Sequence, residues 1–182
     1  MIKVTCSLCG QDAFTVRYPA TLNGSSDVNV DAFRCTNPGY GHHPQIVQCA
    51  NCGFVYANPR WAEDDLLAAY TAVEDQTYVS ERIGRELTFR KHLQHLQKWT
   101  GPGNGRSLLD VGAYIGVFVE VAQAAGWQAM GVEPSDWAAA EAQKRGLDVI
   151  VGTQDAPELD GRQFDVVTMW DVIEHVDDPA AE

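Results

Sequence analysis

The sequence predicts an α/β protein in which a parallel sheet follows a small cysteine-containing domain. Three observations lead to this fold class. After residue 105, apolar strand-like runs alternate with alanine-rich helical runs, as in a parallel sheet covered on both faces. Two Cys-x-x-Cys-Gly motifs stand within the first 53 residues. Between these parts, glycine and proline interrupt every periodicity at residues 101–105, which indicates a boundary.

Length and charge limit the classes of function. The chain has 182 residues, of which 45% are hydrophobic and 21% charged, as in a globular protein. Its 13 Lys and Arg against 25 Asp and Glu give a formal charge of −12, which argues against a nucleic-acid partner. No apolar run is long enough for a membrane span or a signal peptide. We therefore expect a cytoplasmic protein with no membrane partner.

The first cysteine motif contains Cys6 and Cys9, and the second contains Cys49 and Cys52. Two intervening residues allow both sulfurs of a motif to face one ion, and the glycine that follows lets the backbone turn back. Four thiolates in a tetrahedron suit Zn²⁺ and leave no open position, so the motifs predict a structural zinc site. The alternative is two unrelated reduced pairs. Redox use is disfavoured because neither pair opens a helix after a strand.

The segment between the motifs adds Cys35, His42 and His43, which are also of metal-binding types. We interpret them as loop residues, because four cysteines already complete the coordination shell. Short strands at 47–49 and 54–56 flank the second motif, and the domain is expected to resemble a zinc ribbon.

Two helices are expected before the boundary, at residues 63–73 and 80–99. The second carries apolar residues at roughly helical spacing, which predicts one apolar stripe packed against the next domain. The residues of this stripe are Ile83, Leu87, Phe89, Leu93, Leu96 and Trp99. We accordingly divide the chain into a zinc-binding domain (1–60), a helical connector or lid (61–104) and a sheet domain (105–182).

Four strands are predicted in the sheet domain, at residues 107–111, 128–132, 148–151 and 164–170. Helices at 116–125 and 135–145 connect the first three, and Ser135 is positioned to cap the second helix. The fourth strand is almost wholly apolar. It forms an exposed edge, which favours pairing with a second copy of the chain in a homodimer.

The loop after the first strand lies at the carboxyl ends of the strands, where such sheets bind ligands. It runs from Asp110 through Gly112 to Gly116. Tyr114 and Val117 stand where the dinucleotide fingerprint needs its second and third glycines. The second glycine admits a pyrophosphate, so the loop disfavours a nicotinamide dehydrogenase.

Glu133 ends the second strand, 21 residues after Gly112. A carboxylate at this place accepts hydrogen bonds from both ribose hydroxyls and repels a 2′-phosphate. Together with the loop, it indicates an adenosine without pyrophosphate. S-adenosylmethionine fits this description, because Asp110 favours its cationic sulfonium and amino groups.

Three segments resemble the class I S-adenosylmethionine-dependent methyltransferases in order and spacing: D-V-G-x-x-x-G, G-V-E-P-S and F-D-V-V-T-M-W-D-V-I-E-H-V-D-D-P. That family has a Rossmann-like sheet of seven strands. The motifs C-S-L-C-G and C-A-N-C-G-F-V-Y-A-N-P-R extend the resemblance to bacterial members with an amino-terminal zinc-binding domain, which often act on nucleotide-linked sugars or other small metabolites. The cofactor-binding residues that the resemblance implies are Asp110, Gly112 and Gly116 at the methionine end, Glu133 at the ribose, Asp155 near the adenine and Asp171 beside the cofactor.

Methyl transfer to a carbon or hydroxyl of a small-molecule acceptor also needs a base. Glu174 and His175, after the fourth strand, are the candidate catalytic residues, with a structural role as the alternative. Core packing is favoured for Tyr70 and Tyr78 over lining the acceptor pocket. With four of the seven family strands visible, we expect a truncated form or an exchange of segments between copies. The competing functions are a non-catalytic S-adenosylmethionine-binding or assembly module and, against the charge, a zinc-ribbon RNA-binding protein.

Overall fold

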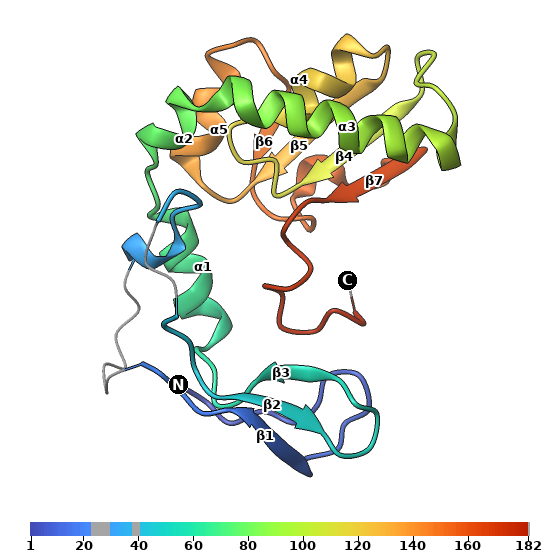
Figure 1. The fold of residues 1–182 in the computed structure, drawn as a ribbon. Coiled ribbons are helices and arrows are strands. Elements are labelled where there is room, and N and C mark those ends of the chain that lie inside the picture. The colour runs from blue at the N-terminus through green and yellow to red at the C-terminus, as the bar shows by residue number, and fades with distance from the viewer. Residues whose placement is uncertain (23–29, 38–40, 182) are drawn as a thin grey trace. The chain divides into compact units, whose positions relative to one another are not determined.

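The computed structural model describes residues 1–22, 30–37 and 41–181, and the chain forms two compact units (Figure 1). One unit contains Met1–Tyr70 together with Ile173–Glu182, and the other contains Thr71–Val172. The division at residue 70 falls inside the segment 61–104 that the sequence suggested as a connector.

The first unit is built on a three-stranded antiparallel sheet. Strand β2 (Ile46–Cys49) lies between β1 (Phe14–Tyr18) and β3 (Val55–Ala57), and its residues Val47 and Cys49 are buried. The second cysteine motif forms the turn from β2 to β3, as the sequence predicted. The described residues of this part of the chain also form the 3-10 turn η1 (Val30–Phe33) and helix α1 (Glu63–Thr71).

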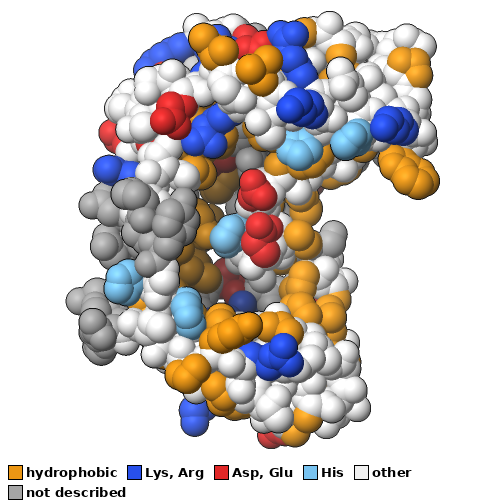
Figure 2. Space-filling model, in the orientation of Figure 1, with side chains coloured by type: hydrophobic (Ala, Val, Ile, Leu, Met, Phe, Trp, Pro, Cys, Tyr) orange, Lys and Arg blue, Asp and Glu red, His pale blue; other side chains and the backbone are white. Residues whose placement is uncertain are grey.

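This small sheet leaves much of its apolar surface in solvent. Phe14, Val16 and Tyr18 of β1 are 40%, 50% and 59% exposed, and Val55 of β3 is 48% exposed. Hydrophobic side chains gather over the small sheet on the face drawn in Figure 2. A unit that buries so little apolar surface gains little stability from its core, and therefore depends on another source such as a bound metal.

The second unit contains a parallel sheet with the strand order β6-β5-β4-β7. Its strands are β4 (Ser107–Val111), β5 (Gln128–Glu133), β6 (Val149–Val151) and β7 (Val166–Met169). The α/β fold with four parallel strands is confirmed. Strand β7 is at the edge and leaves Val167 53% exposed.

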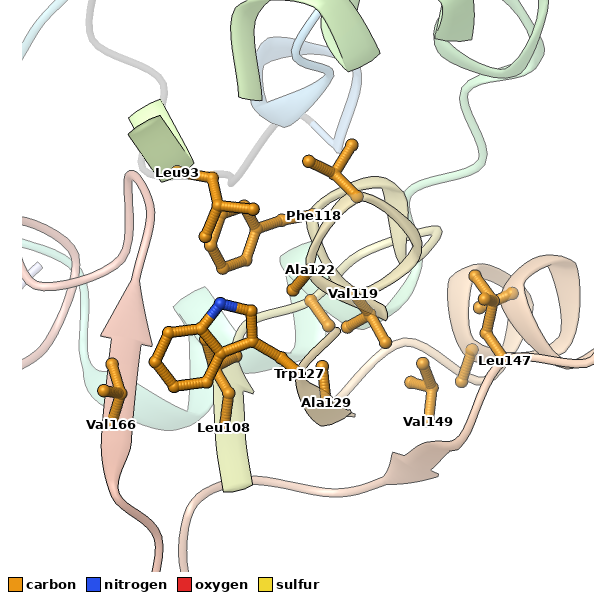
Figure 3. Close-up of a cluster of buried hydrophobic side chains, with 14 residues drawn as sticks. Leu93, Leu108, Phe118, Val119, Ala122, Trp127, Ala129, Leu147, Val149 and Val166 are labelled. Atoms are coloured by element: carbon orange, nitrogen blue, oxygen red, sulfur yellow. The ribbon is translucent and has the colours of Figure 1, made fainter. Parts of the chain in front are cut away.

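Three helices cover one face of this sheet. They are α3 (Arg82–Thr100), α4 (Val117–Ala124) and α5 (Asp136–Gln143), and the short helix α2 (Gln76–Ser80) precedes α3. Figure 3 shows the core between these helices and the sheet, where Leu93 of α3 and Phe118 of α4 lie above Leu108 of β4. Ser135 caps α5 as predicted, because its hydroxyl accepts a hydrogen bond from the Ala138 amide at 3.3 Å.

The opposite face of the sheet is covered by the connection from β6 to β7, which contains the 3-10 turn η2 (Pro157–Leu159). Alternate residues of β4 and β5 point to this side, so Leu109 and Met130 pack against Ala156 and Phe164 of the connection. The cover on this face is therefore a loop with one turn of helix.

The predicted stripe on α3 was wrong in part. Phe89, Leu93 and Leu96 pack against the core, but Ile83, Leu87 and Trp99 are 70%, 59% and 91% exposed. At about 100° per residue, the first three lie within about 60° of one another, and the others point elsewhere. No helix in the described part of the chain combines the length and hydrophobicity needed to cross a lipid bilayer.

The tight contact between β5 and the loop after β4 leads to a prediction on stability. A Cβ atom at Gly131 would lie 2.4 Å from Cβ of Ala113, so Gly131→Ala is expected to destabilise the second unit by about 1–3 kcal/mol. The matched control is Gly84→Ala in α3, where a Cβ atom would have no neighbour within 4 Å. This substitution is expected to raise the free energy of unfolding by up to about 1 kcal/mol, because alanine has the better helix propensity. Urea unfolding measures both, and equal effects would contradict the packing.

Candidate functional site

The strand order of the parallel sheet reverses beside β4. Strands β5 and β6 lie on one side of β4, and β7 lies on the other. In open α/β sheets the ligand crevice opens at such a reversal, at the carboxyl ends of the strands. Gly112 follows β4 there, with φ of 70°, and a Cβ on it would lie 2.5 Å from Cγ2 of Val172. Only glycine fits this position.

The loop between β4 and α4 ends at Gly116, which has φ of 74° and caps α4. A Cβ on this residue would lie 2.8 Å from Cδ1 of Leu147 and 3.1 Å from Cβ of Ala142. The glycine therefore serves the close approach of α4 to α5 and the following turn. Its expected place at the methionine end of a ligand stays a prediction.

Glu133 joins the end of β5 to this loop. Its Oε2 accepts a hydrogen bond from the Tyr114 amide at 2.7 Å, and its Oε1 accepts one from the Ser135 amide at 2.9 Å. Glu133 is 6% exposed, and this burial raises the pKa of its carboxyl, although the two amides favour the charged form. Each carboxylate oxygen has a second lone pair, so the group is able to accept two further hydrogen bonds.

Asp110 lies one strand away and is 2% exposed. The Thr168 hydroxyl of β7 donates to its Oδ1 at 2.7 Å. Burial raises the pKa of Asp110 to about 7, with a smaller contribution from the charge of Glu133. Sequence reasoning missed Thr168, although a single hydroxyl in an otherwise apolar strand was a signal. The two carboxyl groups place negative charge beside the reversal point.

The four motif cysteines come together in the first unit. Their sulfur atoms all lie within 4.8 Å of one another, and Cys6–Cys52 and Cys9–Cys49 are separated by 3.5 Å between sulfurs. Zinc at about 2.3 Å from each of four thiolates would place the sulfurs about 3.8 Å apart, so the arrangement fits that ion.

The backbone of each cysteine motif explains how the four sulfurs converge. The amides of Gly10 and Gly53 donate to the carbonyls of Cys6 and Cys49, at 2.7 and 3.1 Å. Both glycines have positive φ, 72° and 81°, as the turn required.

The environment of these thiols favours a cation among them. Backbone hydrogen bonding at Gln11, with help from the Asn51 side chain, lowers the pKa of Cys9 to about 6. For Cys52, hydrogen bonding at Phe54 favours the thiolate, but desolvation and the neighbouring sulfurs raise its pKa to about 12. Without a positive ion, the sulfurs resist losing all four protons together, and zinc removes that repulsion.

A family model described as "Methyltransferase domain" matches residues 78–182, more than half of the chain. The chain belongs to this methyltransferase family. The match covers the glycine loop, Asp110, Glu133 and the segment after β7, so these residues are part of the methyltransferase domain, and the four cysteines lie outside it.

Solved structures similar to the chain carry methyltransferase names. Magnesium protoporphyrin IX methyltransferase from Synechocystis PCC 6803 with bound SAH is 24% identical, with a TM-score of 0.40, over 56% of this chain and 49% of that chain. A possible histamine N-methyltransferase from Thermotoga maritima is 28% identical, with a TM-score of 0.43, over 57% of this chain and 45% of that chain. The chain thus spans about half the length of these proteins. A comparison with curated proteins gives no match.

Two further predicted cofactor residues lie at strand ends of the methyltransferase domain. Asp155 is exposed in the turn after β6, and Asp171, which follows β7 with Trp170 between them, is exposed and adopts a φ of 54°. Both stand at the carboxyl edge of the sheet, which is the edge of Glu133. Their contacts with a ligand stay predictions.

The candidate catalytic residues Glu174 and His175 lie in the segment Ile173–Glu182, which belongs to the first unit. The same segment is the last part of the region that matches the methyltransferase family model. Nδ1 of His175 lies 2.8 Å from the hydroxyl of Tyr70 on α1, and the ring centroids are 5.3 Å apart. Burial, followed by the charges of Cys35 and Glu174, raises the pKa of Tyr70 to about 12, so its phenol keeps its proton at neutral pH. His42 and His43 lie in the described part of the chain, outside the cysteine cluster.

A cavity of about 470 Å³ opens at the other edge of the sheet. Its lining includes the residues that begin or precede strands of the methyltransferase domain: Ser107, Gln128, Asp148 and Phe164. Because parallel sheets bind ligands at the carboxyl ends of their strands, this cavity is not the candidate site.

The buried Asp110 predicts a pH-dependent stability. Its carboxyl has a higher pKa in the folded than in the unfolded state, so its stabilising effect is complete below about pH 4 and is lost as the pH rises through 7. Asp110→Asn is therefore expected to raise the free energy of unfolding by up to about 4 kcal/mol at pH 8, and by less at pH 5. The exposed Asp148→Asn is the control, and a gain independent of pH would contradict the assignment.

Proposed function

We propose that the chain binds S-adenosylmethionine at the carboxyl ends of β4, β5 and β7 and transfers its methyl group to a small-molecule acceptor. The observation that carries this proposal is the Glu133 carboxylate, which is buried at the end of β5 and fixed by two backbone amides beside the glycine loop. Its two remaining lone pairs suit the two hydroxyls of a ribose. Tyr114 replaces the glycine that a dinucleotide pyrophosphate needs.

The other residues of the site fit the rest of the cofactor. The ionised carboxylate of Asp110 favours the cationic amino and sulfonium groups, and Thr168 orients it. Gly112 and Gly116 give the loop two glycine turns of positive φ beside Glu133, and Asp155 and Asp171 supply acceptors at neighbouring strand ends. Bound S-adenosylmethionine supplies an electrophilic methyl group, and the transfer depends mainly on positioning the acceptor in line with it.

We propose His175 as the base when the acceptor is a hydroxyl or an acidic carbon. In the tautomer whose Nδ1–H donates to the oxygen of Tyr70, Nε2 carries no proton. Nε2 is then able to take the proton that the methylated molecule loses. Glu174, the neighbouring residue in the sequence, is proposed as the second catalytic residue. By the family resemblance, nucleotide-linked sugars are the first acceptor class to test.

The four cysteines are proposed to hold one structural Zn²⁺. Their sulfur geometry suits a closed tetrahedral site, and they leave no position open for a substrate. The zinc would supply stability to the first unit and take no part in the methyl transfer.

The function is tested by turnover. Purified protein with S-adenosylmethionine and a panel of nucleotide-linked sugars is expected to form S-adenosylhomocysteine and a methylated sugar, both measured by mass spectrometry. His175→Gln should lower kcat by about 100-fold or more and leave cofactor affinity unchanged. Cofactor binding without turnover on any acceptor would favour the non-catalytic binding module.

A further inference from the structure

Tyr114 has an unusual backbone for its residue type. Its φ is 50°, in the left-handed region that costs a non-glycine residue roughly 1 kcal/mol. Its amide donates to Oε2 of Glu133 at 2.7 Å, so this conformation is held by the same carboxylate that we propose as the ribose ligand. The backbone of Tyr114 is thus tied to the binding site.

The side chain of Tyr114 contacts two other elements of the second unit. Its ring meets the ring of Tyr78 on α2 edge-to-face, with centroids 4.6 Å apart and planes at 84°. It also lies 6.1 Å from the ring of Trp137 on α5. Tyr78 is 8% exposed, and the guanidinium of Arg85 lies 3.7 Å from the centre of its ring. The aromatic contact is therefore well packed on the side of α2.

Helix α2 depends on such contacts for its order. It has five residues, which is too short to be stable by itself in water. Asp75 caps it by accepting from the Tyr78 amide at 3.0 Å, and the amides of Val79 and Glu81 bond back along the chain at 3.3 and 3.0 Å. Along with Val79, the ring of Tyr114 packs on the cluster that contains Tyr78, Ile115 and Val117. Loosening the ring of Tyr114 would remove a main support of α2.

We propose that Tyr114 is a positioning residue that couples cofactor binding at Glu133 to the order of helix α2. The proposal rests on the function proposed above. A ribose that bonds to Glu133 fixes the carboxylate, the carboxylate fixes the Tyr114 amide, and the Tyr114 ring then holds Tyr78. By linkage, the ordered α2 raises cofactor affinity by the same factor by which the cofactor suppresses opening of α2. An aromatic pair of this geometry accounts for a factor of about 2 to 10.

Amide hydrogen exchange of residues 75–82 tests the proposal, with S-adenosylhomocysteine as the probe. In the wild-type protein, the probe is expected to slow exchange of the Val79 and Glu81 amides by about 2- to 10-fold beyond any global stabilisation. Tyr114→Phe keeps the ring and should behave as the wild type. Tyr114→Ala loses the ring at similar backbone cost, so it should bind the probe more weakly by the same factor and show no added protection of α2.

A second pair of variants approaches the contact from the other side. Tyr78→Phe keeps the aromatic pair, and Tyr78→Leu removes it. Only Tyr78→Leu should therefore lose the added protection of the α2 amides by the probe. These two variants test the coupling if Tyr114→Ala does not fold. The coupling is overturned if Tyr114→Ala or Tyr78→Leu shows the full wild-type protection, or if the wild type binds the probe without any change at α2. Absence of probe binding by the wild-type protein would instead remove the proposed function, as isothermal titration shows separately.

Discussion

Replacing Cys49 with serine is expected to release the metal and unfold the first unit. Cys49 is 2% exposed and lies at the end of the middle strand β2, so the substitution removes one of the four proposed zinc ligands from a buried position of the small sheet. Structural zinc contributes about 10–16 kcal/mol of binding free energy in small domains, much of which is folding free energy. The exposed side chains of β1 indicate that little else stabilises this sheet.

Elemental analysis and circular dichroism measure the effect of Cys49→Ser. The wild-type protein is expected to carry one zinc per chain and Cys49→Ser none, with loss of the β signal of the first unit. Cys35→Ser is the matched control, because Cys35 is an exposed cysteine outside the cluster. A wild-type protein purified without zinc from zinc-containing medium, or a Cys49→Ser protein that keeps one zinc per chain, would refute the metal site.

Replacing Glu133 with glutamine is expected to weaken S-adenosylhomocysteine binding by about 100-fold or more. The carboxylate has two oxygens that each accept a backbone amide, whereas glutamine offers one oxygen and one NH₂ group. The NH₂ group of the glutamine would then face the amide N–H of either Tyr114 or Ser135, and neither group accepts a hydrogen bond. The ribose would also lose charge-assisted hydrogen bonds, each of which contributes about 1.5–3 kcal/mol.

Isothermal titration with S-adenosylhomocysteine measures this loss, and circular dichroism confirms that the variant is folded. Glu158→Gln serves as the control, because Glu158 is an exposed glutamate of η2 in the same unit. Equal affinities for wild type and Glu133→Gln would remove Glu133 from the binding site.

Local patterns predicted the elements of the fold well. The continuous apolar runs located the four parallel strands to within two residues, and the cysteine spacing brought four sulfurs together. These features follow from local chemistry. A strand buried on both faces needs a continuous run of apolar residues, and a metal-binding turn needs two cysteines and a glycine at fixed spacing. The fold class was therefore available before any tertiary contact was known.

Contacts between residues far apart in the sequence could not be predicted from local patterns. The hydroxyl of Tyr70 and Nδ1 of His175 approach across 105 positions of sequence, and Asp110 finds Thr168 across 58. The α3 stripe failed for a different reason, since Ile83 and Leu87 are apolar but lie on another side of the helix from Leu93. Apolar character alone does not assign a side chain to the core, because much of any protein surface is apolar.

Glu133 was predicted from the sequence only in part. Its position at the end of the second strand was predicted, but its two amide partners depend on the folded loop and on the cap of α5. The structure thus adds two backbone amides that hold the carboxylate in place beside the loop.

A crystal structure of the protein with S-adenosylhomocysteine tests the central claim most directly. We expect electron density for the cofactor product at the carboxyl ends of β4 and β5, with the two ribose hydroxyls about 2.5–3.0 Å from the carboxylate oxygens of Glu133. Density for the product elsewhere, or a ribose held by groups other than Glu133, would contradict it.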